Sequence, residues 1–290
     1  MKLARYTQDG QTRLGIIGGD GIVALTEAIC PYTDMVDLLA AGRPALDALA
    51  AWLPQAAEPL PLAAVYLEAP IARPPKFLAI GLNYADHIDE TDFVKPDFPM
   101  FFNKQSTCVN GPYDPIHMPR VSTKLDYEGE LGVVIGRRCR HVPRDRAGEV
   151  VAGYLIVNDV SVRDWQARSA TFTLGKSFDT HGPIGPWITT PDEVGDPHRL
   201  DFRTLVSGKQ RQSSNTRHMI FNIWEQIEVL STAFTLEPGD IIATGTCAGV
   251  GFRMKPRGYL KIGDTVRVEI DRLGYIENSV IAEPADTDRI

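Results

Sequence analysis

From Phe77 onward, the chain is a series of short β-rich segments separated by Gly, Pro and Asp turns. The segments read FLAIGLNY, LGVVIG, VAGYLIVNDV, PIGPWITT, GDIIATGT and GDTVRVEI. Apolar, β-branched runs of this length between turn residues are typical of strands. Few helical stretches lie between them, whereas a βαβ nucleotide-binding fold needs a helix between nearly every pair of strands. The pattern therefore predicts an α+β protein that is mostly β, with a few packed helices.

The clearest helix is predicted over residues 216–234. Its apolar residues recur at helical spacing and are Ile220, Ile223, Trp224, Ile227, Leu230 and Phe234. Either Asn215 or Thr216 would serve as the N-cap, since both side chains can accept a hydrogen bond from a free backbone N–H. We interpret this apolar stripe as core packing.

A different pattern precedes Phe77. Residues 2–25 contain apolar runs around the turn clusters QDGQ and GGDG, which predicts short strands. Residues 34–53 are rich in Ala and Leu and predict one or two helices, broken near Gly42–Pro44. A Pro-punctuated stretch, residues 58–75, follows as an extended linker. We therefore expect a small N-terminal α/β domain with its linker over residues 1–72 and a second domain over residues 73–290.

Composition limits the function classes. The formal net charge is −7 and no long Lys/Arg run occurs, which argues against binding to nucleic acid or to an anionic membrane surface. The four cysteines are far apart and show no zinc-ligand spacing, so free thiols in a reducing compartment are expected. The first residues lack the apolar core of a signal peptide, and no apolar run is long enough to span a membrane. These features predict a cytoplasmic protein.

The stretch DYEGELGVVIG places two glutamates at the entry of a predicted buried strand. Because side chains alternate along a strand, Glu128 and Glu130 point to the same face, where their carboxylates repel each other. Asp159 follows another apolar strand, in NDVSVRD. Three carboxylates beside buried strands are oxygen ligands of the kind that a hard divalent cation prefers, and a cation would offset their repulsion. The alternative is an exposed strand end with solvated charges.

Three further residues carry weaker signals. His87 and Glu90 in GLNYADHIDE would face each other on a helical turn, where the carboxylate can orient the imidazole as a general base. Lys176 in GKSFDTHGPIGPW could hold a substrate carboxylate or enolate. The loop ATGTCAGVG lacks the GK[ST] of a phosphate loop, so nucleotide binding is rejected, but Thr246 could offer its hydroxyl to an anion. The alternatives are solvated surface side chains and a plain strand-to-loop transition.

The joint order of these motifs is more specific than any one of them. GLNYxDHxxE, DYExEL, NDxSxRDxQ, GKSxDTxGPIGPW and GDIIATGT follow one another along the chain. In this order the sequence resembles the fumarylacetoacetate hydrolase family from Phe77 to about Ile281. The N-terminal part is similar to the small, variable domain of bacterial members. The resemblance implies a twisted, mixed β-roll or sandwich that carries the catalytic site.

The resemblance also implies a site. Glu128, Glu130 and Asp159 match the ligands of Mg2+ or Mn2+, for which Ca2+ can substitute in a crystal. His87 matches the general base that activates water, with Glu90 as its partner on a segment that often acts as a lid. Lys176 matches the contact to the substrate oxyanion. Residues that line the substrate site in the family correspond to Arg163, Gln166 and Thr246. Family members are commonly homodimers that act on small 2-oxo or diketo acids.

The implied reaction is hydrolysis of a C–C bond in an acylpyruvate or related 2,4-diketo acid, through a metal-held enolate. The same scaffold also supports isomerases and decarboxylases of 2-oxo or 2-hydroxy-dienoic acids, in aromatic or sugar-acid catabolism. A non-catalytic binding protein is the third possibility. Two departures from the usual motifs, His181 and Cys247, leave the substrate open; we favour a packed His181 without a catalytic role and an inert Cys247.

Overall fold

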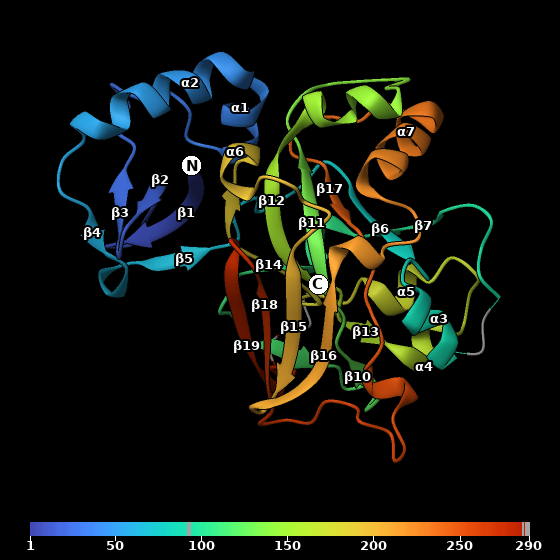
Figure 1. The fold of residues 1–290 in the computed structure, drawn as a ribbon. Coiled ribbons are helices and arrows are strands. Elements are labelled where there is room, and N and C mark those ends of the chain that lie inside the picture. Colours follow the sequence, from blue (N-terminus) through green and yellow to red (C-terminus); the bar gives the residue numbers. More distant parts are fainter. Residues whose placement is uncertain (92–93, 286, 288–290) are drawn as a thin grey trace.

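The computed structural model describes residues 1–91, 94–285 and 287. Two β-sheets dominate it, so the predicted α+β, mostly β fold class is confirmed (Figure 1). The larger sheet has the order β4-β3-β2-β1-β14-β12-β11-β17-β6-β7, with β5 paired to β1 and β8 to β14. Its strands, in chain order, are β1 (Lys2–Gln8), β2 (Gln11–Gly18), β3 (Gly21–Ala24), β4 (Leu60–Pro61), β5 (Tyr66–Glu68), β6 (Phe77–Gly81), β7 (Met100–Lys104), β8 (Val109–Asn110), β11 (Gly129–Ile135), β12 (Val151–Asn158), β14 (Gly182–Thr189) and β17 (Ile241–Ala243).

The second sheet packs in front of the central strands in Figure 1. Its order is β16-β15-β18-β19-β9, and a separate two-stranded ribbon joins β10 to β13. These strands are β9 (Ile116–Met118), β10 (Leu125–Asp126), β13 (Ser161–Val162), β15 (Asp201–Val206), β16 (Lys209–Asn215), β18 (Thr265–Ile270) and β19 (Gly274–Ala282).

The described α-helices are few and short, as expected. They are α1 (Met35–Ala40), α2 (Gly42–Trp52), α3 (Ala85–Thr91), α4 (Arg163–Gln166), α5 (Thr173–Lys176), α6 (Pro191–Val194) and α7 (Ile223–Ala233). Figure 1 shows α1 and α2 with β1–β3 at one side of the molecule, and α3, α4 and α5 gathered at the other. None of the described helices has the length and apolarity needed to cross a membrane.

The N-terminal strands and helices lie where the sequence predicted them, whereas the predicted linker, residues 58–75, also contains the short strands β4 and β5. Three strands precede two helices, and the helices break at Ala41, next to the predicted Gly42–Pro44 position. Asp34 caps α1 by accepting a hydrogen bond from the backbone N–H of Val36 at 2.7 Å. The first strand pairs with β14, which places Lys2 opposite Thr189. The N-terminal strands therefore extend the same sheet that carries β11 and β12, and the predicted domain boundary falls between β5 and β6.

The helix predicted over residues 216–234 begins later than expected. Asn215 does cap a helical turn, but only the short 3-10 turn Thr216–His218. The α-helix begins after Asn222, whose side chain accepts from the N–H groups of Trp224 and Glu225, while Glu225 accepts from the N–H of Asn222. This reciprocal capping box is the stronger start signal, which explains the shift.

The central strand β11 is buried on both faces. Leu131, Val133 and Ile135 pack into a core with α7 and the second sheet. Val134 packs on the opposite face, with α1 and the N-terminal strands. Burial on both faces explains the unbroken apolar run LGVVI. Side chains at the start of this strand therefore enter the interior.

Candidate active site

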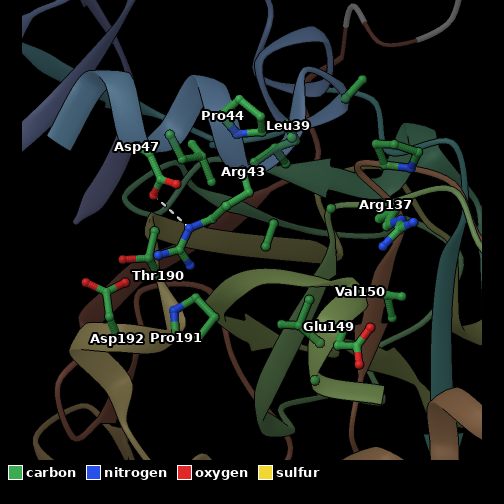
Figure 2. Close-up of a pocket in the computed structure, with 18 of the residues that line it drawn as sticks. Leu39, Arg43, Pro44, Asp47, Arg137, Glu149, Val150, Thr190, Pro191 and Asp192 are labelled. Atoms are coloured by element: carbon green, nitrogen blue, oxygen red, sulfur yellow. Dashed lines mark hydrogen bonds and ion pairs between the residues drawn. The ribbon is translucent and has the colours of Figure 1, made fainter. Parts of the chain in front are cut away.

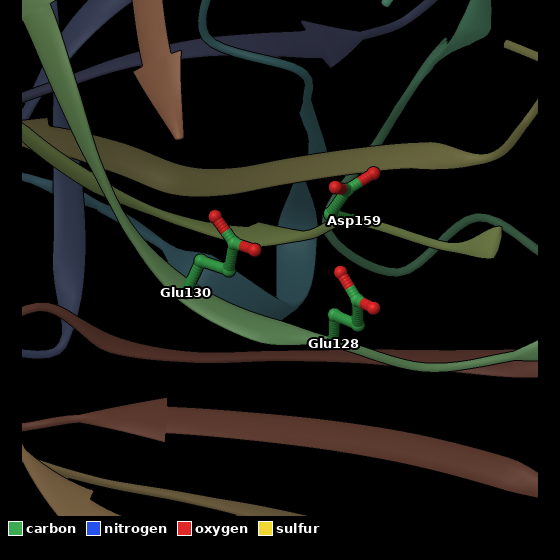
Figure 3. Close-up of side chains that lie close together, drawn as sticks. All are labelled: Glu128, Glu130 and Asp159. Carbon is green, nitrogen blue, oxygen red and sulfur yellow. The ribbon is translucent and has the colours of Figure 1, made fainter. Parts of the chain in front are cut away.

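The register of two neighbouring strands brings three carboxylates together. Strand β11 pairs antiparallel to β12, so that Glu130 lies opposite Val157, and the backbone N–H of Asp159 donates to the carbonyl oxygen of Glu128 at 2.8 Å. Glu128, Glu130 and Asp159 consequently project on one face, as Figure 3 shows. Their ligand atoms lie within 4.8 Å of one another, and all three residues are buried. Glu128 and Glu130 thus share a face, and the alternative of a solvated strand end is excluded.

Two buried lysines neutralise part of this charge. The Nζ atom of Lys176 lies 2.6 Å from Oε2 of Glu128 and 2.7 Å from Oδ2 of Asp159. Lys104, on β7, lies 2.7 Å from the other carboxylate oxygen of Asp159, and its side chain is fully buried. Lys104 also donates to the backbone carbonyl of Lys176. Lys176 is therefore an interior ammonium group rather than a solvated lysine.

The ionisation of the two glutamates differs. Burial opposes ionisation of Glu128, but the charges of Lys176 and Arg163 outweigh it and lower the pKa of Glu128 to about 2. Burial and the nearby charges of Asp159 and Glu128 raise the pKa of Glu130 well above its usual value. The nearby cations therefore stabilise the negative charge of Glu128, but they do not offset the repulsion and burial at Glu130. Three buried oxygen ligands with this deficit fit a hard divalent cation such as Mg2+ or Mn2+.

Arg163 and Gln166 lie on α4, beside the triad. Arg163 donates from Nε to Asp126 at 2.8 Å and pairs through Nη1 with Oε1 of Glu128 at 2.7 Å. Nη1 also donates to the side-chain oxygen of Gln166 at 3.0 Å. Burial alone would lower the pKa of Arg163, but the charges of Glu128 and Asp126 raise it, so this guanidinium is cationic. Its Nη2 is buried and has no hydrogen-bond partner among the described residues.

His87 and Glu90 face each other on α3, as their spacing predicted. Nδ1 of His87 lies 2.8 Å from Oε1 of Glu90, and the other carboxylate oxygen of Glu90 accepts from the backbone N–H of Gly249 at 3.0 Å. The Nδ1–H tautomer of His87 satisfies this contact and leaves Nε2 as a proton acceptor. Glu90 therefore orients the imidazole and is itself held by the Gly-rich loop.

The Gly-rich loop closes over the triad from the end of β17. The backbone N–H of Gly245 donates to Oε2 of Glu130 at 2.8 Å. Gly245 has a φ of +100°, and a Cβ there would lie 2.6 Å from Cβ of Asn83, so only glycine fits. The hydroxyl of Thr246 donates to the carbonyl of Gly129 at 2.9 Å and accepts from Gln212 at 2.7 Å. Thr246 therefore lines the site while its hydroxyl proton is bonded to the backbone of β11.

These groups surround a single cavity of about 350 Å3. Its lining residues are Ile80, Gly81, Leu82, His87, Met100, Phe102, Glu128, Glu130, Arg163, Gln166, Ala167, Phe172, Lys176, Thr246, Val250 and Phe252. The volume suits a small organic ligand. Among the predicted site residues, Glu90 and Asp159 are not in this lining, but they contact His87 and Lys176, which are.

A larger cavity of about 960 Å3 lies away from the triad, between α2 and the far ends of β11 and β12 (Figure 2). Two pairs of its charged side chains lie at the surface. Arg43 pairs with Asp47 at 2.7 Å, and both are well exposed. Arg138 pairs with Glu237 at 3.2 Å in the same way. Exposed pairs of this kind contribute little, so this cavity is a weaker candidate than the one beside the carboxylate triad.

The two unusual motif residues do not line the site cavity. His181 is buried, stacks on Phe178 and lies with Nε2 2.9 Å from the carbonyl of His117. Burial lowers the pKa of His181 to about 3, so the ring is neutral. Cys247 is buried with its Sγ 3.4 Å from the carbonyl of Ala248, and burial raises the pKa of its thiol. Both contacts are those of packed residues.

Two buried charges of the site were not predicted from the sequence. Asp126 accepts from Arg163 and from the backbone N–H groups of Gly251 and Phe252, at 2.8 and 2.9 Å. Lys104 holds Asp159. A signal existed for both. Lys104 is the last residue of the strand MFFNK, which begins with three apolar residues. Asp126 starts the same DYEGE stretch that holds Glu128.

Three buried carboxylates on a strand pair, next to a cavity with cationic side chains, are the arrangement of a metal-dependent enzyme that acts on small molecules. Comparison with known proteins gives the family. The chain belongs to the fumarylacetoacetate hydrolase family: the model of the fumarylacetoacetate (FAA) hydrolase C-terminal region matches residues 76–281. A protein of Burkholderia ambifaria that carries a hydrolase name is 46% identical over 280 residues, which cover 94% of this chain and 96% of that protein.

Two of the solved structures that resemble this chain align with 98% of it and with the whole of their own chains. Maleylpyruvate hydrolase from Sphingobium sp. SYK-6, in complex with manganese(II) and pyruvate, is 35% identical with a TM-score of 0.82. The 5-carboxymethyl-2-hydroxymuconate delta-isomerase from Mycobacterium smegmatis is 35% identical with a TM-score of 0.78. The family assignment made from the sequence motifs is confirmed, and the chain is an enzyme of a superfamily that includes hydrolases and isomerases.

Proposed function

We propose that the protein is a divalent-metal-dependent hydrolase that cleaves a C–C bond in an acylpyruvate or related 2,4-diketo acid. The observation that carries the proposal is the position of His87. Its ring lines the same 350 Å3 cavity as Glu128, Glu130 and Lys176, and Glu90 holds it through Nδ1. A general base beside a carboxylate triad suits the activation of water next to a chelated substrate.

Glu128, Glu130 and Asp159 would hold Mg2+ or Mn2+. A bound divalent cation would polarise the 2-oxo group and stabilise the negative charge that develops when the C–C bond breaks. Arg163 and Gln166 would orient the substrate carboxylate, with Thr246 lining the wall beside them. Lys176 would stabilise the developing oxyanion with its buried ammonium group.

The protein residues account for the proton transfers. Nε2 of His87 would take a proton from water as the water oxygen attacks the distal carbonyl carbon. The bond between that carbon and C3 of the pyruvate unit then breaks, which gives a carboxylic acid and the enolate of pyruvate. Return of the proton from His87 to C3 would yield pyruvate. Glu90 would stabilise the imidazolium that forms between the two transfers.

Isomerisation or decarboxylation of a 2-oxo or 2-hydroxy-dienoic acid at the same site is the alternative. The observation that favours it is the likeness to the Mycobacterium smegmatis isomerase, which covers the whole of that chain. The same triad would support proton transfer between carbons, with His87 as the proton carrier and no attack by water. A homodimer and a cytoplasmic location remain predictions from the sequence; light scattering of the purified protein tests the first.

Product analysis tests the function. The protein, loaded with Mn2+ or Mg2+, is incubated with acetylpyruvate, fumarylpyruvate, oxaloacetate and a 2,4-diketo-3-deoxy sugar acid. We expect pyruvate and a free carboxylic acid from at least one diketo acid, and none after chelation of the metal. Carbon dioxide, or an isomer without cleavage, would contradict hydrolysis and support the alternative.

A further inference from the structure

The lining of the site cavity combines two kinds of side chain. The charged and hydrogen-bonding ones are His87, Glu128, Glu130, Arg163, Gln166, Lys176 and Thr246. The remaining side chains are all apolar and are Ile80, Leu82, Met100, Phe102, Ala167, Phe172, Val250 and Phe252. The two kinds meet at Phe102 and Phe252, whose ring centroids lie 5.1 Å from Nζ of Lys176 and 5.8 Å from Cζ of Arg163. A ligand that fills the cavity therefore contacts both charged groups and hydrocarbon.

The polar side chains have groups for one carboxylate and one oxo group. The buried Nη2 of Arg163 has no hydrogen-bond partner among the described residues, although Nη1 and Nε are engaged. An unpaired buried donor is costly, and a ligand carboxylate would satisfy it. Lys176 and the triad would contact the oxo group next to that carboxylate. Among the described residues, the lining holds no further lysine or arginine for a second carboxylate.

Part of the apolar lining is a built wall. Phe172 contacts Phe102 edge to face, with ring centroids 5.9 Å apart and an angle of 76°. The backbone of Phe172 has a φ of +61°, in the left-handed region that bulky residues rarely adopt. Packing thus holds this ring against the backbone preference, just before α5 and Lys176.

Two arginines near Phe252 do not line the cavity. The guanidinium groups of Arg253 and Arg257 lie over the ring of Phe252, with their Cζ atoms 5.5 and 4.6 Å from its centroid. Arg253 also donates from Nε to the backbone carbonyl of Glu90. Arg163, whose Cζ atom lies 5.8 Å from the same centroid, does line the cavity, and its side chain also pairs with Asp126 and Glu128.

We propose that the substrate arm beyond the 2-oxo acid is apolar and uncharged, and that Phe172 and Met100 select it. A second carboxylate on the arm would lose its hydration against this wall without gaining a partner. The inference rests on the proposed function for the reaction that follows binding, but the recognition itself needs only the 2-oxo acid. A substrate whose arm ends in a second carboxylate would therefore bind less tightly to this site.

Two isosteric ligands test the proposal. 2-Oxoglutarate ends its arm with a carboxylate, and 5-methyl-2-oxohexanoate has an isopropyl group in the same place. Neither contains the second carbonyl that hydrolysis requires, so calorimetry on the Mn2+-loaded protein measures binding alone. We expect the isopropyl ligand to bind at least about tenfold more tightly. Equal or tighter binding of 2-oxoglutarate would overturn the proposal, and so would binding of neither ligand.

Variants of the wall assign the preference to its residues. Met100→Lys places a cation in the lining and is expected to reverse the preference. Leu174→Lys is the matched control, because Leu174 lies on α5 with its side chain exposed and outside the lining. Phe172→Asn keeps a residue that tolerates the left-handed backbone and should weaken the isopropyl ligand by about tenfold, with little effect on 2-oxoglutarate. An unchanged preference in both wall variants would refute their role.

Failure of this proposal is distinguishable from failure of the proposed reaction. Tight binding of the isopropyl ligand without pyruvate release from any diketo acid would refute hydrolysis and leave the assignment of the arm standing. Pyruvate release that is faster from succinylpyruvate than from its isostere 4-methylpentanoylpyruvate would support hydrolysis and refute the apolar arm.

Discussion

Lys176 and Glu128 form a buried ion pair in which Nζ lies 2.6 Å from Oε2, inside the carboxylate triad. The same Nζ contacts Asp159, so one ammonium group joins two of the three proposed metal ligands. Burial would lower the pKa of Lys176, but the charges of Asp159 and Glu128 raise it, which keeps the group cationic. A metal ion at the triad and Lys176 therefore share two carboxylates.

Lys176→Met should separate metal binding from catalysis. Loss of a positive charge beside two ligands strengthens attraction for a cation by about 1 kcal/mol or more, so Mn2+ affinity should rise about tenfold. The rate should fall by roughly 100-fold or more, because the oxyanion loses its ammonium partner. Calorimetry and steady-state kinetics measure the two effects. Weaker Mn2+ binding in this variant would contradict the shared-ligand arrangement.

Lys104→Met tests a residue that the sequence did not reveal. It would leave Oδ1 of Asp159 buried without its partner, which typically costs about 3–5 kcal/mol. Urea unfolding without metal should show this loss, and saturating Mn2+ should restore part of it. Lys209→Met, at an exposed residue of β16, is the control and should change stability by no more than about 0.5 kcal/mol. A loss that Mn2+ leaves untouched would show that Lys104 supports packing alone.

His87→Ala should reduce the rate of pyruvate formation by roughly 100- to 10,000-fold, since a general base typically contributes that much. Mn2+ affinity should stay within about twofold, because the side-chain hydrogen bond of His87 goes to Glu90 and not to a proposed ligand. His218→Ala is the control, as His218 is exposed and lies outside the cavity lining. Turnover of a diketo acid at the wild-type rate in His87→Ala would remove His87 from the mechanism.

His181 predicts a specific acid sensitivity. Burial lowers its pKa to about 3, whereas an unfolded chain has a His pKa of about 6.5. The unfolded state thus binds more protons between these values. The contribution of neutral His181 to the free energy of unfolding is complete above pH 6.5. It is lost as the pH falls toward 3, by at most about 1.4 kcal/mol per pH unit. His181→Gln, which can still donate to the carbonyl of His117, should flatten the dependence in metal-free urea unfolding. Parallel curves for both proteins would rule out this buried neutral histidine.

Much of the fold could be predicted because local patterns agreed with tertiary structure. The turn clusters before Gly21 and the alternation of β-rich segments gave strands where the structure has them. The start of α7 was wrong because Asn215 and Asn222 are both good caps, and only the reciprocal contact with Glu225 selects the second. The N-x-x-E spacing of Asn222 and Glu225 is a local signal that favours the second cap, and the prediction did not use it.

The site was predictable only in part, for a geometric reason. Alternation along a strand placed Glu128 and Glu130 on one face, but the position of Asp159 depends on the register between β11 and β12. The family motifs supplied that link. Lys104 was missed because a lysine in a strand is normally expected at the surface. The apolar wall comes from segments far apart in the chain, so no local pattern could have predicted it.

The most direct test of the central claim is incorporation of oxygen from labelled water. The Mn2+-loaded protein is incubated with an acylpyruvate that it turns over, in water enriched in 18O, and the acid released from the acyl group is analysed by mass spectrometry. The account predicts one 18O atom in the carboxyl group of that acid and an equal amount of pyruvate. An isomerised or decarboxylated product that carries no 18O from cleavage would contradict hydrolysis and make His87 a carrier of protons between carbons.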